Sequence, residues 1–507
     1  MRATGTWGVG AYRRLGTAGA AAAVAGGWAV GTLPARDPWG LWVPHGPAAT
    51  AAGYALAYGG LTLLVVSWWL YGRAGASVRH SLVTLGWWAA PFVLAPPLYS
   101  ADVYSYIAQG AMVLEGHDVY SVGPSVLDPA GPGGDAAASV GGHWTETPAP
   151  YGPFFLVLAK GVAWATGGTI VPAVLGLRII ALGALALIAW ALLRLAREHG
   201  RSASAALWLG ALNPLLLMHV VGGIHNDGLM AGLMLAGVVL ALRGRWVTGA
   251  VLIGLAAMVK SPAALALLFV GVVVGRAATG PLVRRMAKGL LPGLVAGAVA
   301  VLATLLGGTG FGWLGTQSVA GRIHTALSVS SDLGLGLGHL LRLLFGADPD
   351  PVKSAVQNLG LLVALVVIAV LARRSWTGRT EPVHALGLAL LALVALSPMV
   401  QPWYLLWGTA VIAATACDGR VRNVVTVLSA ALVYETQPSG STPPYGFVLA
   451  GLTCAVGFLL LRRDAAVQEA VRVPGPRRPE DGGTGAGAGA DGSTGAGTEA
   501  DVRTGAH

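Results

Sequence analysis

Asp102 is the residue of this chain whose surroundings most clearly indicate chemistry. It stands in the stretch SADVYSYIAQGAMVLEGHDVY, with Tyr104, Tyr106 and Tyr120 nearby. A carboxylate held next to a reacting hydroxyl can take its proton as a general base, whereas an ordinary loop acid is only solvated. Three further polar motifs interrupt apolar sequence: GGIHNDGL with His225, Asn226 and Asp227, MVKSPAAL with Lys260, and SPMVQPWYLLW with Gln401, Trp403 and Tyr404.

Each of these three motifs also has an ordinary structural interpretation. The segment from His225 to Asp227 could cap a helix, Lys260 could extend to lipid phosphates, and Trp403 and Tyr404 could belong to an aromatic belt. We favour ligand binding for the first motif, because polar residues at a membrane-embedded turn are costly. His225 and Asp227 alone are too few to hold a metal, so no metal site is predicted.

The composition indicates that these motifs lie in a membrane protein. Of the 507 residues, 55% are hydrophobic and 11% are charged, which is too little charge to cover a water-soluble protein of this size. The net charge of +10 does not indicate nucleic-acid binding, because Lys and Arg form short clusters between apolar segments. Cys417 and Cys454 lie in or beside apolar segments, so no disulfide framework is expected.

Apolar segments recur along the chain and predict an all-α polytopic membrane protein with about 13–14 transmembrane helices. They lie near residues 15–33, 51–71, 80–97, 170–193, 203–220, 228–242, 246–259, 262–275, 286–307, 353–372, 383–397, 402–416, 423–436 and 445–461.

The distribution of basic residues predicts the orientation of the chain. Basic clusters occupy every second gap between apolar segments, which places both termini in the cytoplasm. Residues 98–150 contain acids but no Lys or Arg, so this loop and Asp102 are expected at the outer face. We predict one membrane domain over residues 1–463, with outer loops at 98–169 and 308–352. Residues 464–507 are predicted to be a disordered cytoplasmic tail, because large apolar residues become rare there.

Two segments of the first outer loop are predicted to be helices that lie along the membrane. If residues 151–167 crossed it, the cluster Arg194–Arg201 would lie outside, against the positive-inside rule. The apolar run of this segment also reaches only about 22 Å, less than a bilayer core of about 30 Å. The stretch that begins at Asp102 has an apolar stripe on one helical face and polar residues on another.

Taken in order, the motifs resemble those of a known family. SADVYSYIAQGAMVLEGHDVYSVGP, PAPYGPFF, LNPLLLMHVVGGIHNDGLM, AAMVKSPAAL and SPMVQPWYLLW resemble the actinobacterial polyprenol-phosphomannose-dependent alpha-1,6-mannosyltransferases, which are C-type (GT-C) membrane glycosyltransferases. The resemblance extends from about residue 50 to 460. It implies a GT-C fold, a polyprenyl-phosphate-mannose donor, a lipomannan-type alpha-1,6-mannan acceptor and no cofactor. Three apolar segments precede the acidic loop, where the simplest members of the superfamily have one.

Such a donor requires a base, a cation and walls that bind sugars. Asp102 is expected to be the base of an inverting displacement at the outer face of the plasma membrane. Lys260 and Arg322 are expected to bind the departing phosphate, with His324 as a weaker candidate. Sugar or acceptor contacts are expected from Tyr104, Tyr106, His225, Asn226, Asp227, Gln401, Trp403 and Tyr404.

Two alternatives remain compatible with the sequence. The donor could be polyprenyl-phosphate arabinose or glucose, because the orientation of one hydroxyl is read by geometry that the sequence does not reveal. A lipid-sugar flippase or secondary transporter would also have many spans and broken helices with polar residues. The loop at residues 98–150, which is amphipathic and lacks cations, favours an enzyme.

Overall fold

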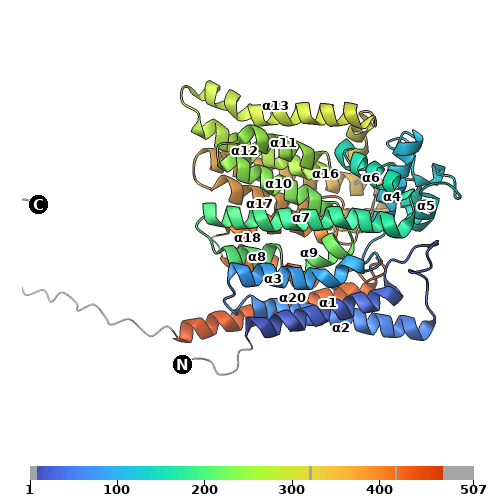
Figure 1. Ribbon diagram of the computed structural model, residues 1–507. Helices are drawn as coiled ribbons and strands as arrows, with labels where there is room; N and C mark the ends of the chain where they lie inside the picture. Colours follow the sequence, from blue (N-terminus) through green and yellow to red (C-terminus); the bar gives the residue numbers. More distant parts are fainter. Residues whose placement is uncertain (1–7, 319–322, 417–418, 472–507) are drawn as a thin grey trace, which may run out of the picture. The chain divides into compact units, whose positions relative to one another are not determined.

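The structure is a computed structural model that describes residues 8–318, 323–416 and 419–471 (Figure 1). The chain divides into two units, residues 1–459 and 460–507, and the description below concerns the first. All regular elements of the described residues are helical, which confirms the predicted all-α class.

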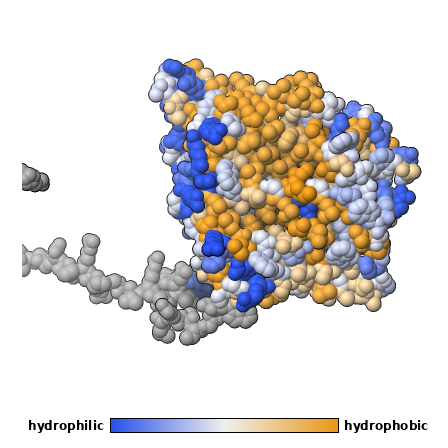
Figure 2. Space-filling model, viewed as in Figure 1, coloured by the Kyte–Doolittle hydropathy of each residue, from blue (hydrophilic) through white to orange (hydrophobic). Residues whose placement is uncertain are grey.

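Among the described residues, five helices are long and apolar enough to cross a membrane. Figure 2 shows an apolar surface over the middle of the first unit, with hydrophilic residues gathered towards both ends of its helices. The polytopic prediction is therefore confirmed. The long helices are α2 (Pro47–Tyr71), α7 (Ile170–Glu198), α13 (Leu282–Gly307), α16 (Pro349–Trp376) and residues Pro444–Asp464 of α20 (Pro444–Val471).

The other predicted apolar segments are mostly shorter or broken helices. The segment near 203–220 consists of α8 (Ala203–Gly210), α9 (Pro214–Leu216) and a π-helical turn, η4 (Leu217–Gly222), with a bend of 48°. Irregular backbone of this kind is tolerated at membrane depth where protein covers it. The remaining short elements are α10 (Asp227–Leu242), α11 (Trp246–Ala257), η5 (Ser261–Ala264), α12 (Leu265–Ala277), α17 (Pro382–Leu396), η8 (Pro402–Tyr404), α18 (Leu405–Thr415) and α19 (Gly419–Leu432).

The N-terminal helices pack closely on one another and on α8. A Cβ atom at Gly19 of α1 (Val9–Val30) would lie 2.7 Å from the carbonyl oxygen of Gly60 in α2, so only glycine permits this approach. Trp68 of α2 stacks on Trp208 of α8, and each indole N–H donates to the other residue's carbonyl. The helix α3 (Val78–Ala89) and the short turn η1 (Ala90–Leu94) then lead to the segment that carries Asp102.

The segment predicted to be the first outer loop folds into helices that lie at one end of α7 (Figure 1). Residues 151–167 form a helix, α6 (Pro153–Thr166), which is too short to be counted among the full-length spans. In α4 (Asp102–Glu115), every residue from Val103 to Met112 is buried, so this stretch of the helix lies inside the protein. The loop also contains η2 (Pro124–Val126), α5 (Gly134–Val140) and η3 (Gly142–Glu146).

Two predicted ranges contain helices. In residues 308–352, η6 (Gly312–Leu314), η7 (Thr316–Ser318) and α15 (Val329–Phe345) occupy much of the range, and α16 begins within it. Helix α20 continues to Val471, past the predicted start of the tail at residue 464. Residues 472–507 and Arg322 lie outside the described residues.

Candidate active site

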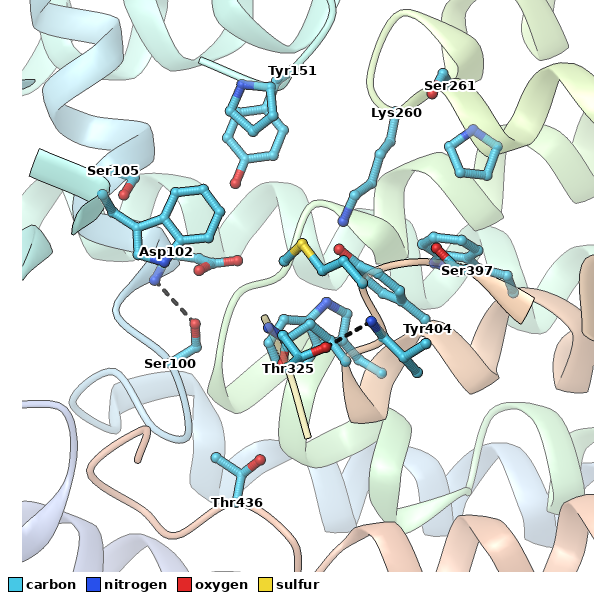
Figure 3. A pocket seen from close by; sticks show the side chains of 18 of the residues that line it. Ser100, Asp102, Ser105, Tyr151, Lys260, Ser261, Thr325, Ser397, Tyr404 and Thr436 are labelled. Atoms are coloured by element: carbon cyan, nitrogen blue, oxygen red, sulfur yellow. Dashed lines mark hydrogen bonds between the residues drawn. The ribbon is translucent and has the colours of Figure 1, made fainter. Parts of the chain in front are cut away.

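A cavity of about 770 Å³ lies where several helix breaks meet. The first residue of α4 contributes the Asp102 carboxylate, and the break between α11 and η5 contributes Lys260. The break before η8 contributes Gln401, with Trp403 and Tyr404 directly after it. Figure 3 shows these elements around one space, into which Asp102 and Lys260 extend from different sides. A cavity of this size, with a few convergent polar groups, is typical of a ligand site.

Asp102 is the first residue of α4, and its side chain is 30% exposed to the cavity. One carboxylate oxygen, Oδ2, lies 3.2 Å from His225 Nδ1 and 3.5 Å from the Tyr106 hydroxyl. Burial alone would raise the pKa of Asp102, but contact with His225 and the charge of Lys260 lower it below its ordinary value. Asp102 is therefore ionised at neutral pH and can accept a proton.

The backbone on both sides of this contact is in an uncommon conformation. Tyr99 and Ile224 are the non-glycine residues with positive φ among the described residues, at 67° and 57°. Tyr99 stands shortly before Asp102, and Ile224 stands directly before His225. Left-handed backbone is unfavourable for a β-branched or bulky residue, and such strain concentrates at functional sites.

His225 and Asn226 lie behind the wall of the cavity. The His225 ring is buried and stacks on Trp403, with 3.7 Å between the ring centroids. Asn226 makes no side-chain cap on α10, and its side-chain nitrogen and oxygen have no hydrogen-bond partner among the described residues. Simple helix capping by Asn226 is therefore not what the structure shows.

Lys260 is held as a fixed cation at the cavity. Its Nζ lies 3.0 Å from each carboxylate oxygen of Asp227 and 4.5 Å above the ring of Tyr404. Trp407 donates its indole N–H to Asp227 Oδ1 at 2.7 Å. Burial alone would lower the pKa of Lys260, but the negative charge of Asp227 raises it above its ordinary value. The lysine is thus bound within the protein, which argues against nonspecific extension to lipid.

Comparison with known proteins identifies the family. A family model described as alpha-(1->6)-mannopyranosyltransferase, N-terminal domain, matches residues 13–276, and the MptB C-terminal domain matches residues 330–463. The chain belongs to the alpha-(1->6)-mannopyranosyltransferase family. No solved structure matches it.

The chain is similar over most of its length to three proteins that are named alpha-(1->6)-mannopyranosyltransferases. It is 36% identical to a probable alpha-(1->6)-mannopyranosyltransferase of Mycolicibacterium smegmatis, over 79% of this chain and 78% of the relative. It is 32% identical to alpha-(1->6)-mannopyranosyltransferase A of Mycobacterium tuberculosis, over 86% of both chains. It is also 32% identical to alpha-(1->6)-mannopyranosyltransferase B of Corynebacterium glutamicum, over 89% of this chain and 80% of the relative. The protein is therefore a membrane glycosyltransferase that transfers a hexose.

The structure of this mannosyltransferase separates the predicted site residues into two groups. Asp102, Lys260, Gln401, Trp403 and Tyr404 line the cavity, as does His324, which lies 2.7 Å from Asp332. The predicted sugar contacts His225, Asn226 and Asp227 are buried and do not line it. His225 lies against Asp102 and Trp403, and Asp227 pairs with Lys260. No part of Arg322 can be placed, since it lies outside the described residues.

Tyr104, Tyr106 and Tyr120 near Asp102 do not line the cavity. Tyr104 is buried away from the cavity and donates its hydroxyl to the Thr32 carbonyl at 2.6 Å. Tyr106 touches the site from behind, where its hydroxyl is 3.4 Å from the Asn226 backbone N–H. Tyr120 donates to the Tyr151 carbonyl at 3.1 Å. These tyrosines position α4 and its surroundings, whereas Tyr151, which was not predicted, lines the cavity.

Arg178 is a positioning residue that the motifs did not reveal. It lies within α7, its side chain is almost fully buried at 1% exposure, and its hydrogen bonds within the described part of the chain all go to backbone carbonyls. These carbonyls belong to Val93, Ala95 and Pro96 before α4 and to Val221 and Gly222 before His225. The sequence did contain a signal for Arg178, a charged residue inside an apolar segment. Such a residue is costly in a membrane unless it is paired or takes part in function.

A bound metal ion would need several acidic, histidine or cysteine side chains close together. Among the residues that the structure describes, no three of these groups lie close enough together to hold a metal ion. The absence of a cofactor remains a prediction.

Proposed function

We propose that this mannosyltransferase takes mannose from polyprenyl-phosphate-mannose and adds it to a growing alpha-1,6-mannan of a lipomannan-type glycolipid. The observation that carries the proposal is that an ionised carboxylate, Asp102, and a fixed cation, Lys260, face one cavity. These are the two charges that transfer from a sugar phosphate requires, one for the acceptor proton and one for the leaving group.

The reaction would be a single displacement. The acceptor hydroxyl oxygen forms a bond to the anomeric carbon while the bond from that carbon to the phosphate oxygen breaks. The hydroxyl proton passes to Asp102, and the bonding electron pair leaves with the phosphate, which Lys260 stabilises. Attack from the face opposite the phosphate converts the beta link of the donor into the alpha link of the product.

The apolar part of the cavity wall supports a lipid-linked donor. Leu265 of α12, Leu365 and Ile368 of α16 and Leu393 of α17 line the same cavity as Lys260. A polyprenyl chain could lie against these residues, with its phosphate at Lys260. The burial of apolar chain surface at about 25 cal/mol per Å² would then contribute to donor binding.

The basic residues support an outer-face site. Arg197 and the pair Arg373 and Arg374 stand in the last turns of α7 and α16. The α7 helix begins next to the loop that carries α4 and α6 and ends at its basic cluster, so the positive-inside rule puts that loop outside. We infer that the protein lies in the plasma membrane with cytoplasmic termini, where the donor must be lipid-linked.

The proposal is tested by following sugar transfer. Membranes that contain the full chain are given labelled polyprenyl-phosphate-mannose and an alkyl alpha-1,6-dimannoside, and the product linkage is determined by NMR. We expect an alpha-1,6-trimannoside that does not form in membranes with Asp102→Asn. Parallel assays with polyprenyl-phosphate arabinose, polyprenyl-phosphate glucose and GDP-mannose test the other donors. Transfer from one of these, but not from polyprenyl-phosphate-mannose, would overturn the donor assignment.

A further inference from the structure

Glu435 is a carboxylate in the wall of the cavity to which the mechanism assigns no task. It lies in residues 433–443, between α19 and α20, and it is 4% exposed. A nearly buried acid in a membrane protein is expensive unless it is paired or takes part in function. Asp227 meets this requirement through Lys260, whereas none of the ion pairs among the described residues includes Glu435.

The partners of Glu435 are hydroxyl groups. Thr436 donates its hydroxyl to Glu435 Oε2 at 2.5 Å, and the Thr442 side chain also hydrogen-bonds to Glu435. Burial raises the pKa of Glu435, and these two hydrogen bonds oppose the rise. Both threonines line the cavity beside the carboxylate, so this wall presents hydroxyl groups around an acceptor of hydrogen bonds.

The segment that carries Glu435 is fixed against the residues that lead into Asp102. The backbone N–H of Tyr99 donates to the Pro438 carbonyl at 2.8 Å, and the Thr32 hydroxyl donates to the same carbonyl at 3.2 Å. Gly440 approaches Ser100 so closely that a Cβ atom there would lie 3.2 Å from the Ser100 Cα. The wall of residues 433–443 is therefore held in a fixed relation to the base.

The two walls of the cavity differ in charge. In Figure 3, Lys260 enters from one side, Thr436 lies on the opposite side, and Asp102 and Ser100 lie between them. A phosphate would be repelled at Glu435 and attracted at Lys260. A neutral sugar would suit Glu435, because a carboxylate accepts several hydrogen bonds and sugar hydroxyls donate them.

We propose that Glu435, with Thr436 and Thr442, forms the subsite for the acceptor sugar and accepts hydrogen bonds from hydroxyls of the mannose that receives the transferred unit. This proposal rests on the proposed function, since it assigns the side of the same cavity that lies away from the phosphate. The acceptor mannose would then lie between Glu435 and Asp102, with the hydroxyl that attacks next to the base.

The test uses the purified full chain in lipid nanodiscs. Binding of an alkyl alpha-1,6-dimannoside without donor is measured by tryptophan fluorescence, since Trp403 and Trp407 line the cavity. We expect Glu435→Gln to weaken binding about 10- to 100-fold, as expected for loss of a charge-assisted hydrogen bond. In transfer assays, the KM for acceptor should rise similarly, while the KM for donor stays within about twofold.

Glu146→Gln is the matched control. Like Glu435, Glu146 accepts a hydrogen bond from a hydroxyl group, here that of Ser125 at 2.8 Å, but Glu146 is exposed and does not line the cavity. The Glu146→Gln variant should bind the dimannoside as the wild type does. If Glu435→Gln fails to fold, Thr442→Val removes one hydroxyl from the same wall and should also weaken dimannoside binding with little change in donor KM.

The outcomes separate this proposal from the proposed function. If the wild-type protein binds the dimannoside but transfers no mannose to it, the proposed function is overturned. The subsite is still supported in that case if Glu435→Gln weakens the binding. Wild-type protein that does not bind the dimannoside would overturn the subsite. Unchanged dimannoside binding in Glu435→Gln, or an equal rise of donor and acceptor KM, would also overturn it.

Discussion

Lys260 Nζ lies 3.0 Å from both carboxylate oxygens of Asp227, so the cation that faces the cavity is held by an anion behind the wall. The pair explains why the motifs GGIHNDGL and MVKSPAAL occur in one chain. Asp227 directs Lys260 towards the cavity and cannot serve equally well as a base, because its oxygens already accept from Lys260 and Trp407.

The first prediction concerns this pair. Lys260→Ala alone should reduce both stability and donor use, because it leaves Asp227 buried without its cation. In the double variant that combines Lys260→Ala and Asp227→Asn, the thermal midpoint of unfolding should stay near that of the Asp227→Asn single variant. The donor KM should nevertheless rise about 10- to 150-fold, since loss of a charge-assisted contact costs about 1.5–3 kcal/mol. Lys260→Arg should retain more donor use. Wild-type donor kinetics in the double variant would show that Lys260 does not bind the phosphate.

The second prediction concerns the base. Asp102→Asn keeps the shape of the side chain but removes its basicity, so transfer should fall about 10²- to 10⁴-fold while protein abundance and donor binding stay near wild type. Asp128→Asn is the control, because the Asp128 carboxylate does not line the cavity and accepts a hydrogen bond from the Ala130 backbone N–H in the same loop. Near-normal transfer by Asp102→Asn, or an equal loss in the control, would contradict the assignment.

The third prediction concerns pH. Because the pKa of Asp102 is lowered, its basic form persists as the pH falls, and kcat/KM should be lost only when the pH falls below the ordinary range of carboxylate pKa values. His225→Phe keeps an aromatic ring against Trp403 but removes the nitrogen that contacts Asp102. Burial then raises the pKa of Asp102, so the acidic limb should move to higher pH. An unmoved limb in the variant would indicate that His225 does not stabilise the ionised base.

The helical class could be predicted from apolar segments, but the length of each helix could not. Residues 203–220 form one apolar run in the sequence and a bent, partly π-helical element in the structure. Hydrophobic pattern does not separate a span from a short buried helix, because both lack a polar face. The polar face of α4 could likewise be predicted, but its surroundings could not, since Asp102 and Gln109 line the cavity.

The cavity residues of the polar motifs could be found from sequence because polar side chains are rare in this chain. Which of these residues face the cavity could not be predicted from sequence. Asp102 and Lys260 face it, while His225 and Asp227 lie behind its wall. Glu435 stands at the end of an apolar segment, and only the return of residues 433–443 to Ser100 brings it to the site. Such contacts join residues far apart in the chain.

The fourth prediction concerns Arg178. Arg178→Met removes the donor from five backbone carbonyls, and each buried acceptor left unsatisfied costs about 1–3 kcal/mol. We expect a lower thermal midpoint and a lower kcat, with smaller changes in donor and acceptor KM, because Asp102 and His225 lose their common support. Arg178→Lys should recover part of kcat. A lower midpoint with unchanged kcat would make Arg178 purely structural.

The last prediction concerns orientation. In a variant without Cys417 and Cys454, a cysteine at Ala138 in α5 should react with a membrane-impermeant maleimide in intact cells. A cysteine at Ser202, before α8, should react only after the membrane is opened. Both positions are exposed in the structure, so access to solvent does not favour either one. The expected difference follows because α6 is too short to span and α7 alone separates the two positions across the membrane. Labelling of both cysteines in intact cells would mean that α7 does not cross, and the outer-face site would lose its support.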